Sequence, residues 1–271
     1  MTFHTHSLRW DPPENTPVFK QGVYLLHGTG EHAARYAHLA KRLTAAGFRV
    51  GAHDHPGHGQ SDGKRGVMDP AGALVTQAAI QVQRFAAETD CAPVLFGHSL
   101  GGVAATELVI EHGLPVAGLI LSAPAFAPFI RKRDQLKVSL LAHLAPTFTI
   151  ERPYDASRLT HNDNIGKKAE ADPLNHGFRS AGLVNWILKS GARQLSNASL
   201  LDVDTLLLIA GSDVIVDSSR NREFAAAVST SKITTHEYDD CFHEILNETT
   251  DRSDRAFDDI LRWMCERFAD E

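Results

Sequence analysis

The sequence of 271 residues predicts an α/β fold, a mostly parallel central sheet flanked by helices with an inserted helical cap. Short apolar runs alternate along the chain with helical patterns, which is typical of parallel strands joined by helices. This alternation breaks between about Pro124 and Ser190, where no clear buried strand is found. We therefore predict a core of residues 1–124 and 191–271, and a helical cap of residues 125–190.

The elements of the core follow from apolar periodicity. Short buried runs predict strands at 23–26, 48–52, 91–96, 118–122 and 205–210, with a more polar strand at 233–238. Helical spacing predicts helices at 33–46, 71–88 and 103–112, and a closing amphipathic helix at 257–268. Gly47 ends the first of these helices.

The cap is expected to be mainly helical. Leu136, Leu140, Leu141 and Leu144 are spaced for one helix face, and Pro146 ends that pattern. A second helix is expected at 179–189, after two loop-like stretches at 161–164 and 172–173.

Composition limits the class of protein. The net charge is −6 and no basic run is longer than residues 131–133, so nucleic acid is not an expected partner. The first six residues lack the layout of a signal peptide, and no apolar run approaches a membrane span. Three unpatterned cysteines indicate free thiols and a cytoplasmic location. Oligomeric state is not indicated by the sequence.

Residues 97–101, Gly-His-Ser-Leu-Gly, match the G-x-S-x-G pattern between a predicted strand and a predicted helix. In that setting the serine occupies a strained turn with its hydroxyl exposed, so Ser99 is the candidate nucleophile. A serine of this kind needs a general base, an acid that orients the base, and donors for the oxyanion.

Chain order and strand position select the other two residues of a triad. Asp213 comes just after the buried strand 205–210, whereas its rivals Asp217 and Asp204 lie further on and at the opposite end of that strand. His243 lies in the loop before the closing helix, while His236 is inside a strand. The order Ser99, Asp213, His243 is the order that a nucleophile elbow of this kind requires.

The oxyanion donors are expected from two backbone positions. His-Gly-Thr-Gly at 27–30 follows the early strand as a small-residue loop, and Leu100 follows the candidate nucleophile. We predict that the backbone N–H groups of Thr29 and Leu100 form the oxyanion hole.

Residues 53–58, His-Asp-His-Pro-Gly-His, offer a metal-binding alternative with H-x-H-x-x-H spacing. The aspartate that should precede the last histidine is Gly57, and later ligands have no clear candidates. The competing interpretation, which we favour, is a polar loop next to the oxyanion strand, with no metal.

Several motifs in register carry a family resemblance. They are His-Gly-Thr-Gly-Glu-His with Arg35-Tyr36, residues 53–63, residues 97–102, Ser-Ala-Pro at 122–124, Asp-Pro-Leu at 172–174 and His-Glu-Ile-Leu-Asn-Glu at 243–248. Together they resemble the monoacylglycerol lipase/lysophospholipase branch of the α/β-hydrolases, from about Trp10 to the C-terminus. The match is dense in the core and thin in the cap.

The resemblance implies a serine hydrolase that cleaves single-chain acyl esters such as monoacylglycerols without a cofactor, with Ser99, Asp213 and His243 as its triad. It also implies that Glu31, Arg35 and His98 hydrogen-bond the alcohol part of the ester; the alternative is that they form a buried ion pair and fix loops. A lysophospholipase, another acyl hydrolase or aminopeptidase with the same triad, and a non-hydrolytic receptor remain alternatives.

The first part of the cap is rich in large apolar residues beside a basic group of Arg131, Lys132, Arg133 and Lys137. One interpretation is a lid that lines an acyl pocket and touches a membrane or micelle surface. The other is that the apolar residues pack on the core and the basic group is solvated.

Overall fold

The computed structural model describes residues 4–70, 72–152 and 155–269. Within these ranges the main sheet has seven strands in the order β1-β3-β2-β4-β5-β8-β9. All neighbouring pairs are parallel except β1 with β3. The strands of this sheet are β1 (Ser7–Trp10), β2 (Val23–Leu26), β3 (Val50–His53), β4 (Val94–His98), β5 (Gly118–Ser122), β8 (Thr205–Ala210) and β9 (Ile233–Tyr238).

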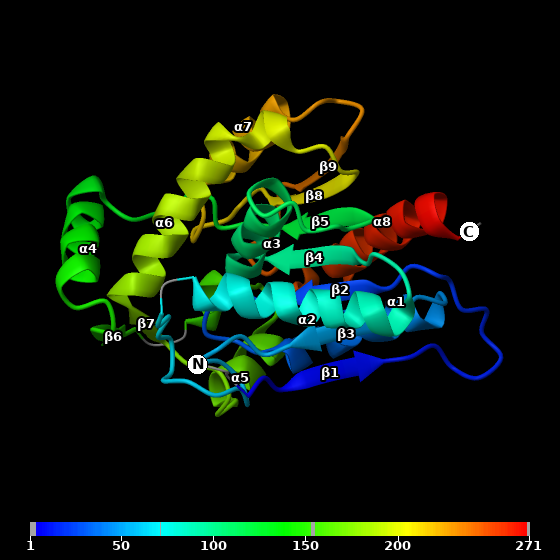
Figure 1. The fold of residues 1–271 in the computed structure, drawn as a ribbon, viewed down its shortest axis with the longest axis horizontal. Helices are drawn as coiled ribbons and strands as arrows, with labels where there is room; N and C mark the ends of the chain where they lie inside the picture. The colour runs from blue at the N-terminus through cyan, green and yellow to red at the C-terminus, as the bar shows by residue number, and fades with distance from the viewer. Residues whose placement is uncertain (1–3, 71, 153–154, 270–271) are drawn as a thin grey trace.

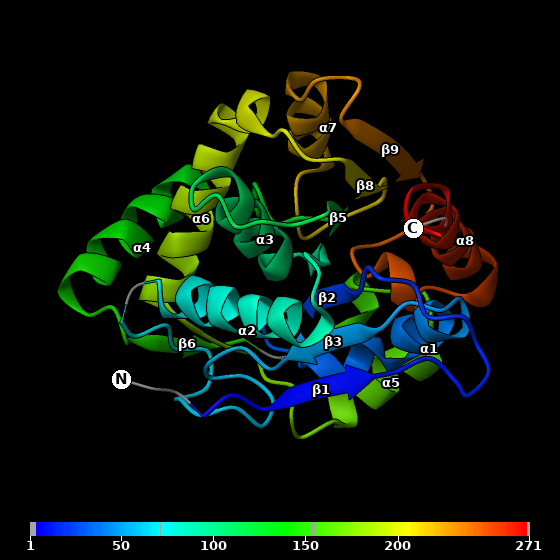
Figure 2. The same ribbon diagram turned by 45° about the vertical axis from the view of Figure 1, so that its right-hand side comes forward.

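Helices cover both faces of the sheet (Figures 1 and 2). On one face lie α1 (Ala37–Ala45) and α8 (Thr250–Phe268). On the other face lie α2 (Ala73–Thr89), α3 (Leu100–Ile110) and α7 (Ser218–Ala227). Short 3-10 turns occur at η1 (Ala33–Tyr36), η2 (Ala156–Arg158), η3 (Ala198–Leu200) and η4 (Ile245–Asn247).

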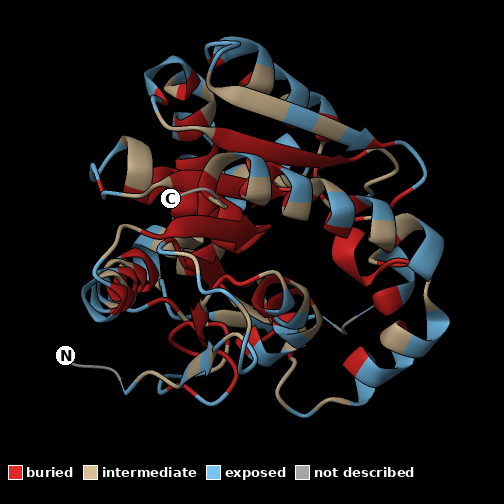
Figure 3. Cartoon of the chain, turned by 90° about the vertical axis from the view of Figure 1, so that its right-hand side faces the viewer, coloured by how far each residue is buried: buried red, intermediate tan, exposed pale blue. Residues whose placement is uncertain are grey.

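The core consists of two apolar layers, one on each face of the central strands. Leu206 and Leu208 of β8 pack in the layer with α8, whereas Leu207 and Ile209 pack in the layer with α3. This follows from the two-residue period of a strand, which sends successive side chains to opposite faces. Figure 3 shows the central strands buried on both sides, as expected for parallel strands between helices.

The segment between β5 and β8 lies beyond the carboxyl ends of the central strands (Figure 1). It comprises α4 (Lys132–Leu144), β6 (Thr149–Glu151), α5 (Asp163–Ala171), β7 (Phe178–Ser180) and α6 (Ala181–Ser196). We keep the name cap for residues 125–190. The predicted boundary at residue 190 falls inside α6, which continues to Ser196 and approaches the backbone of Phe126 at Gly191.

Several local predictions differ from the structure. Residues 161–164 are not all loop, because Asn162 accepts a hydrogen bond from Ile165 N at 3.2 Å and so caps the start of α5. Residues 178–180 form strand β7, so the second cap helix begins at Ala181 rather than at 179. The helix expected at 71–88 corresponds to α2, and residue 71, its expected first residue, lies outside the described residues.

Candidate active site

Ser99 occupies the turn between β4 and α3, with φ 52° and ψ −112°. A residue with a side chain rarely adopts a positive φ, so the turn is strained. Two glycines make the turn sterically feasible. A Cβ on Gly97 would lie 2.4 Å from the carbonyl oxygen of Gly101, and one on Gly101 would lie 2.1 Å from that of Leu26.

The structure brings the three predicted triad residues together in one hydrogen-bonded row. His243 Nε2 lies 2.9 Å from Ser99 Oγ, and His243 Nδ1 lies 2.7 Å from Asp213 Oδ2. All three side chains are buried. This is the geometry that a serine nucleophile, its base and the orienting acid require.

Asp213 is fixed by the turn that follows β8. Its Oδ1 accepts the backbone N–H groups of Ile215 and Val216 at 2.7 and 3.0 Å, which leaves Oδ2 for His243. The rival Asp217 instead caps α7 by accepting from Ser219 N at 3.0 Å. Asp217 therefore caps a helix, and Asp213 is the carboxylate that contacts His243.

The charges of the row are set by burial and by proximity. Burial opposes ionisation of Asp213, but the neighbouring His243 outweighs it and lowers the pKa of that carboxyl. Burial likewise disfavours the imidazolium of His243, while Asp213 favours it and leaves the pKa of His243 raised above its usual 6.5. The pair is thus organised to stabilise a protonated His243.

One of the two predicted oxyanion positions follows Ser99 in the chain, and the other lines the same cavity. Leu100 is the first residue of α3, where the N–H groups of a helix have no acceptor within the helix. Thr29 lies in the loop after β2 and lines the same cavity as Ser99 and His243. This loop is held by Gly30, whose carbonyl oxygen accepts His176 N at 2.8 Å.

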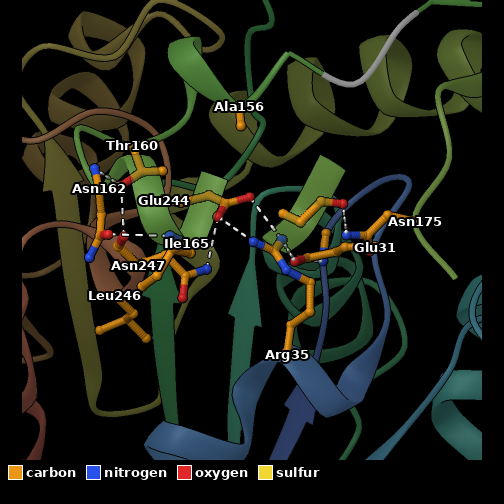
Figure 4. A network of polar contacts seen from close by, with 12 residues as sticks. Glu31, Arg35, Ala156, Thr160, Asn162, Ile165, Asn175, Glu244, Leu246 and Asn247 are labelled. Carbon is orange, nitrogen blue, oxygen red and sulfur yellow. Dashed lines mark hydrogen bonds and ion pairs between the residues drawn. The ribbon is translucent and has the colours of Figure 1, made fainter. Parts of the chain in front are cut away.

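Glu31 and Arg35 form a buried network with Glu244, the residue after His243 (Figure 4). Glu31 accepts hydrogen bonds from Gly28 N, in the loop at residues 27–30, and from the hydroxyl of Tyr36. Arg35 donates to Glu31 and to both oxygens of Glu244, the latter at 2.9 and 2.7 Å. Burial alone would raise the pKa of Glu244, but Arg35 lowers it to about 2.

Sequence reasoning did not assign a role to Glu244. The signal was present in its position next to the candidate base, and in the four-residue spacing of Glu31 and Arg35. The network joins the loop at residues 27–30 to the loop that carries His243.

His98 is the third residue of the predicted substrate-contacting group. Its Nδ1 lies 3.3 Å from Ser122 Oγ, and its ring centroid lies 4.9 Å from that of His243. Burial lowers the pKa of His98 to about 4, so the ring is neutral near pH 7. His98 and Glu31 line the cavity with Ser99.

The cavity above Ser99 has a volume of about 580 Å³ and is built from both core and cap. Val138 and Leu141 of α4 and Val184 and Ile187 of α6 form apolar walls. Ser99, His243 and Thr29 form a polar part of the lining, and charged cap residues such as Arg131, Asp134 and Arg152 line the cavity as well. Such a cavity suits a ligand with one apolar chain and one polar group.

The histidines at 53–58 serve packing and loop hydrogen bonding. His53 Nδ1 meets Tyr24 OH at 3.1 Å, and His55 Nε2 meets the carbonyl oxygen of His27 at 3.0 Å. Asp54 accepts the backbone N–H of Ala33 at 2.8 Å. In the described part of the chain, no three His, Cys, Asp or Glu side chains are grouped to hold a metal ion.

Comparison with known proteins identifies the family. A family model described as serine aminopeptidase, S33, matches residues 18–250. The chain belongs to this family. A monoacylglycerol lipase of Mycolicibacterium smegmatis is 29% identical to this S33 chain over 254 residues, which cover 89% of this chain and 87% of that protein.

An abhydrolase domain-containing protein of Dictyostelium discoideum is 32% identical over 272 residues, covering 97% of this chain. The match takes in only 28% of that longer protein. The crystal structure of the Paleococcus ferrophilus monoacylglycerol lipase superposes with a TM-score of 0.87 at 27% identity, covering 97% and 99% of the two chains. The predicted α/β-hydrolase fold and hydrolase family are confirmed.

Proposed function

We propose that this protein is a serine carboxylic-ester hydrolase that cleaves single-chain acyl esters such as monoacylglycerols. The observation that carries the proposal is the hydrogen-bonded row of Ser99, His243 and Asp213. The similarity to proteins named monoacylglycerol lipase supports the substrate class.

In the proposed mechanism, Ser99 Oγ attacks the ester carbonyl carbon while His243 Nε2 accepts the hydroxyl proton. The tetrahedral intermediate collapses, and His243 returns the proton to the leaving alcohol. A water molecule then attacks the acyl-enzyme with His243 again as base, and the fatty acid leaves. Asp213 stabilises the imidazolium in both halves of the reaction, and no cofactor takes part.

The backbone N–H groups of Thr29 and Leu100 would stabilise the oxyanion. Backbone donors in a rigid loop and at a helix start need little reorganisation as negative charge develops on the carbonyl oxygen. The helix dipole of α3 adds partial positive charge at Leu100.

The apolar walls from α4 and α6 would hold the acyl chain, since burying each CH₂ group contributes about 0.8 kcal/mol. The alcohol part would lie near Ser99, with His98 and Glu31 in the same cavity lining. Arg35 would assist the binding of the alcohol indirectly, because it donates hydrogen bonds to Glu31 and Glu244 and so orients both side chains.

We further propose that the cap contacts a lipid surface. Phe129, Leu136, Leu140 and Leu144 are 60–74% exposed, and the basic residues 131–133 and Lys137 lie among them. Exposed apolar side chains beside cationic ones suit the surface of an anionic membrane or micelle.

The three cysteines, Cys91, Cys241 and Cys265, are unpaired, which supports a reducing compartment such as the cytoplasm. Among the described residues, no helix has the length and apolar character to cross a bilayer.

An aminopeptidase is the second candidate, because the family model carries that description. The same triad can cleave an amide. Turnover of a monoacylglycerol, a lysophospholipid and an aminoacyl-arylamide, measured side by side, separates the ester hydrolases from the aminopeptidase.

The direct test is Ser99→Ala. This variant should lose about 10⁴-fold or more in kcat for p-nitrophenyl esters and should not be labelled by a fluorophosphonate, because the nucleophile is gone. Ser196→Ala, at the exposed end of α6, is the control and should keep both properties. Retained hydrolysis in folded Ser99→Ala would refute the proposal.

A further inference from the structure

The loop that carries His243 lies between β9 and α8, and we call residues 241–248 the histidine loop. Its position depends on contacts rather than on a strand ladder. Ser212 N donates to the carbonyl oxygen of Cys241 at 3.1 Å, which ties the start of the loop to the turn that holds Asp213. Further along the loop, Ile245 and Leu246 pack into the core beside α8, and other residues contact the cap.

A single carboxylate organises the other end of the loop. The side chain of Glu248 is fully buried and accepts Phe242 N through Oε1 at 2.7 Å. Phe242 directly precedes His243, so this hydrogen bond acts one residue from the candidate base. Arg252 lies in the first turn of α8, and its Nη1 is 3.6 Å from Glu248 Oε2.

The same carboxylate reaches the cap. We call residues 159–162 the cap strap. Glu248 Oε2 accepts His161 N at 3.0 Å, and Glu248 Oε1 lies 2.8 Å from His161 Nδ1. The rings of His161 and Phe242 stack with centroids 3.7 Å apart.

Two further hydrogen bonds join the cap strap to the histidine loop. Glu244 N donates to the carbonyl oxygen of Leu159 at 2.8 Å, and Thr160 Oγ1 donates to that of Asn247 at 2.6 Å. Figure 4 shows Thr160 beside Asn247, on the opposite side of Glu244 from Arg35. The cap strap therefore contacts the histidine loop at Phe242, Glu244, Asn247 and Glu248.

We propose that Glu248 is a positioning residue that ties the cap strap to the histidine loop and thereby keeps His243 aligned with Ser99. The inference rests on the proposed role of His243 as the general base. The cap then contributes to catalysis as well as to substrate binding, because the position of the cap strap and the position of His243 both depend on the Glu248 carboxylate.

The chemistry of the contact explains why a carboxylate is needed. Both oxygens of Glu248 face N–H donors, from Phe242 and His161. An amide in its place would turn an NH₂ group toward one of these donors and leave a buried N–H unpaired. The loop would relax, and a shift of about 1 Å at a reacting group can cost about 100-fold in rate.

The test is Glu248→Gln, measured with p-nitrophenyl acetate, a substrate too small to depend on the acyl walls of the cap. We expect kcat to fall about 10- to 100-fold with little change in KM. The far-downfield proton resonance of the His243 Nδ1–H bond to Asp213 should broaden or vanish in a protein whose circular dichroism is unchanged.

Asp240→Asn is the matched control, because Asp240 also pairs with Arg252 but contacts neither Phe242 nor His161 among the described residues. It should keep the wild-type kcat and proton resonance. If Glu248→Gln also keeps both, Glu248 only adds stability and the inference fails, while the hydrolase proposal stands on the active wild type.

His161→Ala tests the cap side without removing the buried carboxylate, and so remains informative if Glu248→Gln does not fold. It should lower kcat by a smaller factor and weaken the same resonance. In the Glu248→Gln background its effect should largely disappear, because the two residues act through one contact. No loss in His161→Ala, or additive losses in the double variant, would overturn the coupling.

Discussion

The core and the cap use the same apolar residue types for different ends. Leu208 in β8 is fully buried, whereas Leu136 in α4 is 74% exposed, and α4 has no buried residue. In the core, the burial of leucines stabilises the sheet that holds Ser99 and Asp213. In the cap, most of the leucines of α4 are exposed, while Leu183 and Ile187 of α6 pack into the core layer on the α3 side of the sheet. The polar contacts of the cap strap add a second attachment to the core.

The two regions should therefore respond differently to the same change. Substitutions in the core should affect chemistry and stability, and substitutions in the exposed helix α4 should affect the choice and delivery of substrate.

The largest effect is expected in the core at Asp213→Asn. His243 would lose the carboxylate that orients it, and kcat should fall by about 10⁴-fold while the fold is kept. Asp217→Asn, four residues on at the cap of α7, should leave kcat nearly unchanged. Steady-state kinetics of the two variants tests the assignment, and equal losses in both would contradict it.

The next effect compares one truncation in the two regions. Leu208→Ala should lower the free energy of unfolding by about 2–5 kcal/mol, because it opens a cavity between α8 and the sheet. Leu136→Ala should change it by less than about 0.5 kcal/mol. Urea unfolding of both variants measures the difference, and a similar loss in each would mean that α4 is part of the core.

A smaller effect is expected in the pH profile. His243 must be neutral to accept the proton, so kcat/KM should fall about tenfold per pH unit below its pKa. The midpoint should lie above 6.5, since Asp213 and then Glu244 raise that pKa against the effect of burial. Glu244→Gln should shift the midpoint to lower pH. A cap variant such as Leu136→Ser should not move it, and a shift there would show that the cap sets the charge of the base.

The smallest effect concerns delivery of the substrate. The double variant Leu136→Ser, Leu140→Ser should hydrolyse monoacylglycerol in anionic vesicles a few-fold more slowly, because two exposed side chains no longer enter the interface. Its turnover of soluble p-nitrophenyl acetate should match the wild type. Cosedimentation with the vesicles gives an independent measurement, and unchanged binding would argue against lipid contact through α4.

The sequence predicted the core well because burial there leaves a clear signal. The strands at 118–122, 205–210 and 233–238 coincide with β5, β8 and β9, since each is an apolar or alternating run with defined ends. The edge strand β1 was not predicted, because its side chains alternate between exposed and half-buried and it is only four residues long. The helix α7 was also not predicted, because it buries few apolar residues.

The candidate site was predictable where chain order limited the choice. Ser99, Asp213 and His243 were chosen by order and by position after strands, and the structure brings them together. The catalytic roles of these residues stay predictions. The contacts of Glu244 and Glu248 were not predicted, because their partners Arg35 and His161 lie far away along the chain; for Glu244, the position next to the candidate base was a signal in the sequence. The cap was hardest, because α4 buries none of its residues and so leaves no clear burial pattern, and β6 and β7 are only three residues long.

The positive φ of Ser99 implies that this turn lowers the stability of the folded protein. Glycine would adopt this turn without strain, whereas the strain of a residue with a side chain held there costs about 1 kcal/mol or more. Ser99→Gly should therefore raise the melting temperature while abolishing hydrolysis. That result would mean that the fold gives up stability at this turn in order to hold a side chain there.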